Sequence, residues 1–314
     1  MTAYLLRRFL SMLATMLVVG IVVFFVIRSV PGDVTSALLG QDATPQQIED
    51  LRRRLNLDQP WPAQFAAWFG GVVRGDLGNS TYMRIPVLQA LAQRLEPTAM
   101  LALAATLVAV TLGIGLGVIA AVRHGTVTDY AVMVVAMLGL SLPTFWLGLL
   151  MIMLFAVTLQ WLPAAGYGAL SDGVGRTVRY LVMPAVALGF SQAAVIARMT
   201  RASLLDALGE DFVRTAKSKG LPPARVVLRH ALRNALLPVL TVIGLSIATL
   251  AGGVVVTETV FNIPGAGRLV IESVQRRDYP VLQGAVIAVA AVYALINLLV
   301  DLSYLALDPR VRYS

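Results

Sequence analysis

The sequence contains no cysteine, so it has no disulfide framework, thiolate metal site or thiol nucleophile. Charged residues are scarce as well: they make up 13% of the 314 residues, while 58% are hydrophobic. A soluble domain carries roughly 25% charged residues. This composition is typical of an integral membrane protein, and the net charge of +8 then suggests signals for membrane orientation more than nucleic-acid binding.

Six apolar stretches lack any Asp, Glu, Lys, Arg or His: residues 9–27, 98–122, 133–158, 180–197, 236–257 and 284–300. A helix of about 20 apolar residues crosses a bilayer, so the sequence predicts an all-α protein with six transmembrane helices. The first stretch is longer than the roughly 7–15 residues of a signal-peptide core, and no small-residue cleavage site precedes Pro31. We therefore expect it to be retained as the first span.

The cations of the short loops are unevenly distributed. With the N-terminus inside, thirteen Lys and Arg are internal, and five are external: Arg176, Arg179, Arg268, Arg276 and Arg277. Because cytoplasmic loops carry an excess of Lys and Arg, both termini are predicted to be cytoplasmic. The long segment 31–97 is then external, and its Trp61, Trp68 and Tyr82 suit either an interfacial aromatic belt or a small packed lid.

The chain has no visible energy source of its own. A proton-coupled carrier normally keeps ionisable residues at mid-membrane, and the six apolar stretches contain none. The phosphate-binding pattern G-x-x-x-x-G-K-[ST] is absent too, so ATP hydrolysis by that route is excluded. If the chain transports anything actively, a partner has to drive it.

The longest internal loop, residues 201–235, has the pattern of two short helices separated by a break. Apolar residues recur at i, i+4 spacing, Gly220 suits a helix C-terminus, and Pro222-Pro223 suits the start of the next helix. The apolar stripe comprises Leu204, Leu208, Phe212 and Ala216. Periodicity alone fits equally a knob that contacts a partner and an amphipathic helix lying on anionic lipid.

The literal residues of this loop favour the first interpretation. Asp211-Phe-Val-Arg-Thr-Ala-Lys-Ser-Lys-Gly-Leu221 and the following Val226-Val-Leu-Arg-His-Ala-Leu-Arg-Asn-Ala-Leu-Leu-Pro238 resemble the coupling loop of binding-protein-dependent ABC permeases of the dipeptide, oligopeptide and nickel branch. Similar matches occur along nearly the whole chain: Tyr4-Leu-Leu-Arg-Arg-Phe9, Arg74-Gly-Asp-Leu-Gly78, Leu142-Pro-Thr-Phe-Trp-Leu147, Glu258-Thr-Val-Phe-Asn-Ile-Pro-Gly-Ala-Gly267, Arg277-Asp-Tyr-Pro280 and Asp308-Pro-Arg310.

The resemblance implies the type I importer fold, with an external segment between helices 1 and 2 and a cytoplasmic coupling helix between helices 4 and 5. Its implied boundaries are 1–30 for the tail and first helix, 31–97 for the external segment, 98–306 for the core and 307–314 for the tail. It implies ATPase coupling for Leu208, Asp211, Phe212, Arg214, Thr215, Ala216, Gly220 and Leu221. Where the broad importer pattern has Glu-Ala-Ala this chain has Arg214-Thr-Ala216, so we expect shape, through Ala216 and Gly220, to matter more than an acidic side chain.

The loop 258–279 is rich in Gly and Pro and is read either as an external hairpin or, as the resemblance implies, as a partly re-entrant element near an outer gate. Backbone at membrane depth is tolerated only in protein or beside a water cavity. The candidates for the gate and pathway are Glu258, Phe261, Pro264, Gly265, Gly267, Arg277, Asp278 and Tyr279. Gly113, Gly115 and Gly117 of the second span are interpreted as close helix-packing positions.

The resemblance further implies partners for the chain in a bacterial inner membrane: a second permease, two ABC ATPases that bind ATP and Mg²⁺, an extracytoplasmic binding protein and membrane lipid. No nucleic acid, metal or cofactor is expected to bind the chain itself, and no catalytic site is expected. Small peptides are the implied cargo, with nickel or a metal chelate as the alternative. Two other classes stay open: an ion-coupled secondary carrier, and an intramembrane protease, which is disfavoured because no histidine lies at membrane depth to activate Ser141.

Overall fold

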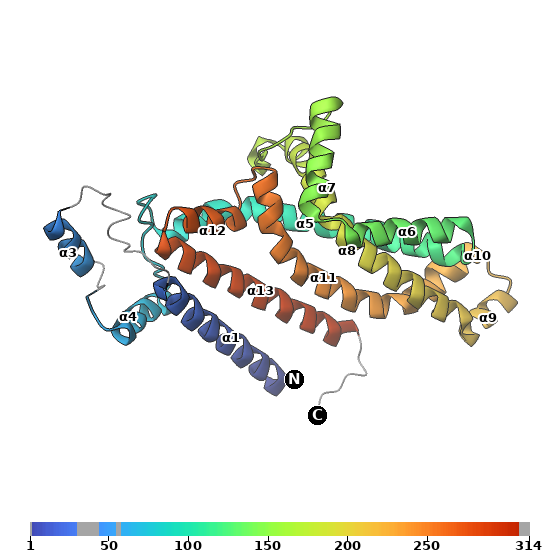
Figure 1. Cartoon of the computed structure of the whole chain (residues 1–314). Coiled ribbons are helices and arrows are strands. Elements are labelled where there is room, and N and C mark those ends of the chain that lie inside the picture. Colours follow the sequence, from blue (N-terminus) through green and yellow to red (C-terminus); the bar gives the residue numbers. More distant parts are fainter. Residues whose placement is uncertain (1, 30–43, 55–57, 308–314) are drawn as a thin grey trace. The chain divides into compact units, whose positions relative to one another are not determined.

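The computed structural model describes residues 2–29, 44–54 and 58–307 (Figure 1). Apart from one isolated bridge between Asn79 and Pro86, these residues form helices and turns. Five helices are long and apolar enough to cross a membrane, and there are six spans if one bent pair counts as a single span. The prediction of an all-α protein with six transmembrane helices is confirmed.

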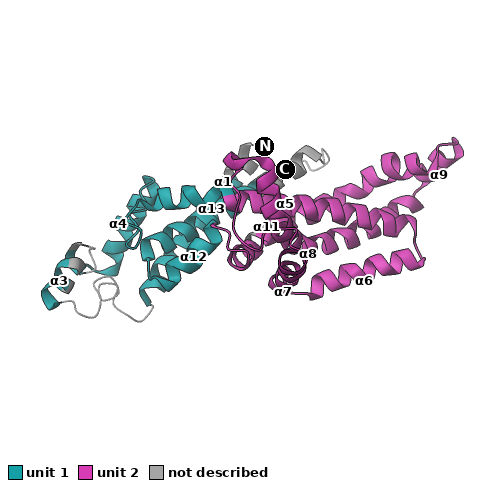
Figure 2. Ribbon diagram, turned by 90° about the horizontal axis from the view of Figure 1, so that it is seen from above, with its two compact units in different colours: residues 1–96, 265–298, 313–314 teal, residues 97–264, 299–312 magenta. Residues whose placement is uncertain are grey.

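The chain forms two compact units (Figure 2). Unit 1 comprises residues 1–96, 265–298 and 313–314, and unit 2 comprises residues 97–264 and 299–312. Unit 1 contains α1 (Thr2–Ser29), α3 (Pro45–Arg54), α4 (Trp61–Val73), α12 (Ala266–Gln275) and most of α13 (Tyr279–Leu307). Unit 2 contains most of α5 (Val87–Val122), then α6 (Val127–Ser141), α7 (Thr144–Met151), η1 (Ile152–Thr158), η2 (Leu170–Asp172), α8 (Val174–Gly209), α9 (Asp211–Ser218), α10 (Pro223–Arg225), η3 (Val226–Ala231) and α11 (Leu232–Val260).

Five of the six predicted spans lie within single helices, and some of these helices extend well beyond the apolar stretch. α5 begins at Val87, eleven residues before the predicted start at 98, because its first three turns carry polar residues that a hydropathy pattern does not mark. α8 has 36 residues and is about 54 Å long at 1.5 Å per residue, so it extends well beyond a bilayer core of about 30 Å. The predicted tail 307–314 lies almost entirely outside the described residues.

The third predicted span is not one straight helix. α6 ends at Ser141, α7 begins at Thr144, and the two segments are bent by 106°. Leu142 has an extended backbone, with ψ 125°, as expected of a residue before proline, and Pro143 has no N–H with which to continue the helix. Pro143 therefore sets the bend.

Unit 1 is held together partly by aromatic side chains. The ring of Phe24 in α1 lies 5.2 Å from Phe65 and 5.6 Å from Trp68, both in α4, and Phe25 lies 5.9 Å from Trp61. Tyr82, farther along the chain, lies under the guanidinium of Arg276 at 3.8 Å. Of the three aromatic residues of segment 31–97, Trp68 thus packs within unit 1, whereas Trp61 and Tyr82 keep about half of their surface exposed.

Unit 2 is organised around α8, whose apolar window is 61% buried, the highest share among the candidate spans. A Cβ atom built on Gly113 or Gly117 of α5 would lie 2.6 Å from the Cβ of Ile196 or Thr200 in α8. These two glycines therefore let the helix backbones approach closely, as predicted. Gly115 differs, because a Cβ atom there would meet nothing within 4 Å; the packing interpretation was wrong for this residue.

Candidate functional site

The predicted coupling segment forms a separate two-turn helix, α9, beyond the end of α8 (Figure 1). α8 ends at Gly209, and Glu210 turns the chain with an extended ψ of 153°. Asp211 lies in the first turn and Lys217 in the last, the placement that the helix dipole favours. Gly220 ends the segment at φ +72°, and its N–H donates to the carbonyl of Lys217 at 2.9 Å. The predicted glycine terminus is confirmed, and Pro223 opens α10 as expected.

One face of α9 is seated on the chain itself. Val213 is fully buried and Ala216 is 6% exposed. Both belong to an apolar cluster, here called the α9 seat, that includes residues of α5, α8, η3 and α11: Ala121, Leu204, Ala207, Val226, Ala231 and Ala235. Leu208 and Leu221 are partly buried against the same cluster. The seat fixes the orientation of α9 relative to the long helices.

The opposite face of α9 is exposed. It carries Asp211, Phe212, Arg214 and Thr215, and Phe212 is 38% exposed although it is a large apolar residue. Arg214 donates to Asp211 at 3.2 Å, but both side chains are more than three-quarters exposed, so this pair contributes little to stability. A short apolar and basic surface is therefore available for contact.

The expected continuous stripe through Leu204, Leu208, Phe212 and Ala216 was wrong. The break at Glu210 interrupts the helical period, so Leu204 and Ala216 face the seat while Phe212 faces outward. The small side chain of Ala216 fits α9 against its own chain, and a partner that approaches the exposed face does not reach it. Gly220 supplies the left-handed turn and is exposed, with nothing within 4 Å of an added Cβ.

The outer-gate candidates are divided between the two units after Pro264. In unit 2, Glu258 is fully buried, and one of its carboxylate oxygens accepts a 2.5 Å hydrogen bond from the hydroxyl of Thr98. Phe261 is buried in the largest core cluster of the unit, and its carbonyl accepts from the N–H of Gly166 at 2.8 Å. Glu258 and Phe261 thus hold the end of α11 in place, and neither lies on an open surface.

In unit 1, Asp278 is 2% exposed and organises the turn at residues 80–82. Its carboxylate accepts hydrogen bonds from the hydroxyls of Ser80 (2.5 Å) and Thr81 (3.1 Å) and from the backbone N–H groups of Thr81 and Tyr82. The structure thus joins Asp278 to the turn that follows the Arg74–Gly78 motif, a link that no spacing in the sequence signals.

The remaining candidates of unit 1 lie in and beside α12. Gly265 and Gly267 are buried at its start, Tyr279 is half-buried, and Arg277 is exposed at φ +54°. The segment is therefore a helix with one buried face, and the simple external hairpin was wrong.

Sequence reasoning missed a charged cluster near the α9 end of unit 2. Arg201 of α8 donates from Nε to Oδ1 of Asp129 at 2.6 Å and from Nη2 to Oδ2 at 2.7 Å. Asp129 lies in the first turn of α6 and is 1% exposed. Its Oδ2 also accepts from the N–H of Gly125 at 3.0 Å. The two partners are 72 residues apart, so no local pattern reveals them.

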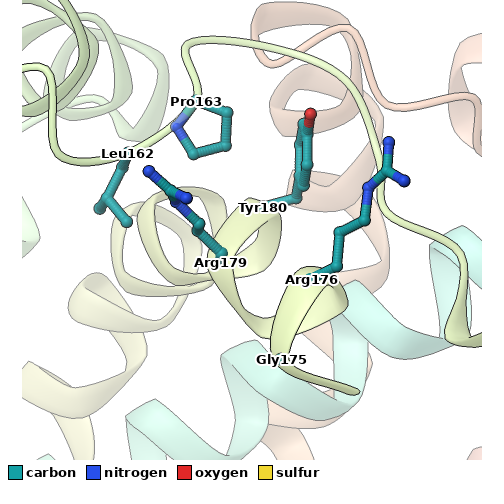
Figure 3. Close-up of a pocket in the computed structure, with 6 residues that line it drawn as sticks. All are labelled: Leu162, Pro163, Gly175, Arg176, Arg179 and Tyr180. Atoms are coloured by element: carbon teal, nitrogen blue, oxygen red, sulfur yellow. The ribbon is translucent and has the colours of Figure 1, made fainter. Parts of the chain in front are cut away.

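A hollow of about 600 Å³ lies at the opposite end of α8, near its first turn (Figure 3). Its lining comprises Leu162, Pro163, Gly175, Arg176, Arg179 and Tyr180. Arg179 donates to the carbonyl of Trp161 at 3.1 Å, and Arg176 pairs with Asp172 at 3.5 Å. Two guanidinium groups at the positive end of a helix suit an anion, but none of the predicted coupling or gate residues lines this hollow.

Comparison with known proteins covers almost the whole chain. Residues 113–313 match the model of the binding-protein-dependent transport system inner membrane component, and residues 1–102 match that of the N-terminal part of such membrane components. Over their full lengths the chain is 45% identical to a probable peptide ABC transporter permease protein, y4tP, of Sinorhizobium fredii. It is 42% identical to the di/tripeptide transport system permease protein DppB of Pseudomonas aeruginosa, with 100% of this chain and 99% of the relative covered.

A solved structure supports the fold independently. The inward-facing MetNI methionine ABC transporter contains a chain that matches 70% of this one and is itself covered to 97%, with a TM-score of 0.58 at 19% identity. At this identity the match concerns the arrangement of helices alone.

Proposed function

The chain belongs to the family of binding-protein-dependent transport system inner membrane components, and we propose that it is the permease subunit of an ATP-binding-cassette importer for small peptides. It is a multi-pass protein of the inner membrane. The observation that carries the proposed role is α9: a short helix, seated through Val213 and Ala216, whose exposed face carries Phe212 and Arg214.

The proposed assembly supplies what this chain lacks. Two ATPase subunits bind ATP and Mg²⁺ and contact the exposed face of α9, and a second permease completes the pathway. An extracytoplasmic binding protein delivers the cargo. Closure of the ATPases on ATP moves α9, and the seat passes this movement to α5, α8 and α11, which alternates access as a rigid-body switch. The chain itself then needs no catalytic site.

The proposed orientation follows from α8. If α9 meets cytoplasmic ATPases, the start of α8 lies about 54 Å away at 1.5 Å per residue, more than a bilayer core, and is external. The positive-inside distribution leads to the same orientation, with both termini in the cytoplasm.

Small peptides are the proposed cargo because relatives that match over the full length are named as peptide and di/tripeptide permeases. Nickel or a nickel chelate is the second candidate, from the sequence motifs shared across this branch. Selectivity is proposed to lie mainly with the binding protein.

The test is transport by the complete complex in vesicles, with its binding protein present. We expect ATP-dependent uptake of radiolabelled dialanine, and loss of both uptake and ATPase attachment in F212D, which places a charge on the exposed apolar contact of α9. V174A is the control, because Val174 is also exposed but lies at the far end of α8. Uptake by F212D at the wild-type rate contradicts the coupling role of α9. Uptake of nickel but not of dialanine by the wild-type complex contradicts the peptide cargo and makes nickel the cargo instead.

A further inference from the structure

The buried residues of α6 are two small residues and one carboxylate. Of its fifteen residues, Asp129, Ala136 and Gly139 are buried. Gly139 lies against Phe190 and Ala194 of α8, where an added Cβ would be 3.0 Å and 3.3 Å from their side chains. Most of the large apolar side chains of α6 are exposed. Contacts of this kind permit close approach, but small side chains do little to fix one helix lengthwise on another.

The fixed point of α6 is therefore its charged end. The two N–H···O bonds from Arg201 to Asp129 form a planar bidentate pair, which has a narrow geometric tolerance. Gly125 and His124 complete the surroundings: the N–H of Gly125 donates to Oδ2, and Nδ1 of His124 lies 3.0 Å from Nη2 of Arg201. The pair is thus braced from the loop between α5 and α6 as well.

The pair lies one helical turn from the α9 seat. Leu204, three residues after Arg201, is fully buried in that seat together with Val213 of α9. A displacement of α9 therefore reaches α8 next to Arg201. From Arg201 the shortest polar connection to α6 runs through Asp129.

Stability alone is a weak reason to bury the Asp129 carboxylate beside the partly buried Arg201. Replacing a buried ion pair by well-packed apolar side chains is often neutral or stabilising, since the charges lose their hydration. What apolar side chains do not supply is a directional link that resists sliding.

We propose that the Asp129–Arg201 pair is a positioning device, here called the α6 clamp, that fixes the register of α6 on α8 so that both move together when α9 is displaced. α6 leads into the bend at Pro143, so the clamp carries the movement on to α7. This inference rests on the proposed importer function. It assigns Asp129 and Arg201 to coupling, and they contact neither cargo nor ATP.

The test separates two roles of the pair: fixing the register of α6 on α8, and stabilising the fold. In the complete transporter in vesicles, D129L/R201M replaces the clamp by an apolar pair of similar size, and Gly125, whose N–H loses its acceptor, is an exposed residue. E49L/R53M makes the same change in an exposed ion pair of α3, in unit 1, and is the matched control. Three quantities are measured: the thermal unfolding midpoint, the ATPase rate, and the number of dialanine molecules transported per ATP hydrolysed.

We expect D129L/R201M to unfold near the wild-type midpoint and to hydrolyse ATP, while its transport per ATP falls by roughly two- to thirtyfold, the range found for residues that modulate coupling. The control keeps the wild-type ratio. R201K keeps the charge but loses the planar fork, and it is expected to lower the transport per ATP by a smaller factor. If the double variant does not fold, the result of R201K tests the clamp in its place.

A wild-type transport ratio in a folded D129L/R201M, or in R201K when that variant has to decide, overturns the clamp. A wild-type complex that shows no ATP-driven uptake overturns the proposed importer function instead. The two failures are therefore distinguishable.

Discussion

The close approach of α5 and α8 makes a sharp prediction, because the same helix supplies its own control. Gly113, Gly115 and Gly117 lie within five residues of each other, yet an added Cβ meets α8 at the first and third and open space at the second. We consider Gly117→Ala, where the new methyl group would lie 2.6 Å from the Cβ of Thr200 and 2.7 Å from the carbonyl oxygen of Ala197.

Two effects of opposite sign decide the result. Replacing glycine by alanine inside a helix stabilises it by about 1 kcal/mol through backbone entropy. Overpacking a tight contact costs about 1–3 kcal/mol, and the upper part of this range applies here because a backbone carbonyl cannot rotate away as a side chain does. G117A is therefore expected to be destabilising by about 1–2 kcal/mol in net terms, and G115A to be neutral or stabilising by up to about 1 kcal/mol.

The assay is the thermal stability of the purified complex in detergent, followed as loss of the intact peak in size-exclusion chromatography. A fluorescent tag on this chain separates its signal from those of its partners. G117A and G113A are expected to lose the intact complex at lower temperature than wild type, and G115A is expected not to. Equal midpoints for G117A and G115A refute the reasoning, because they would show that α5 and α8 do not approach as closely as the structure indicates.

Three further predictions follow from other contacts. D278N is expected to lower the unfolding midpoint, because the carboxylate that accepts four hydrogen bonds becomes neutral, and charge-assisted bonds contribute about 1.5–3 kcal/mol each. A216L is expected to overpack the α9 seat at a cost of about 1–3 kcal/mol, and so to displace α9 and weaken ATPase attachment. T215L changes an exposed residue of the same helix and is expected to leave the seat intact. Since the chain has no cysteine, S218C and V174C each create a single thiol for a membrane-impermeant maleimide. We expect the reagent to label S218C from the cytoplasmic side and V174C from the external side; labelling of both from the same side contradicts the proposed orientation.

The sequence was sufficient where local physics decides the structure. Uncharged apolar stretches identified every span because a bilayer admits little else, and the glycine at 220 and the prolines at 222–223 marked the ends of α9 and the start of α10 because their backbone preferences are intrinsic. The bend at Pro143 was not predicted, because residues 133–158 form one uninterrupted apolar stretch and hydropathy alone does not mark where a helix breaks.

What the sequence did not reveal depends on contacts between distant segments. The stripe through Phe212 assumed one uninterrupted helix, and Glu210 breaks the period. Asp129 lies just before a predicted apolar stretch, and no local pattern joins it to Arg201, 72 residues farther along the chain. Asp278 was a pathway candidate by motif, and only the folded chain shows that the turn at residues 80–82 surrounds it.

Three kinds of contact in unit 2 resist displacement in different ways, and their combination matters for the proposed coupling to an ATPase. The α9 seat is apolar, so it resists separation but weakly resists rotation. The contacts of Gly113 and Gly117 with α8 hold the two helices at a fixed distance. The helices are already in close contact there, and moving them apart would lose packing contacts. The α6 clamp alone has a bond direction, because both N–H···O bonds weaken steeply when they bend. In the proposed clamp, this contact converts a movement of α8 along its axis into a movement of α6. The loss of transport per ATP is therefore expected to be larger in D129L/R201M than in G117A, even though G117A is the less stable of the two.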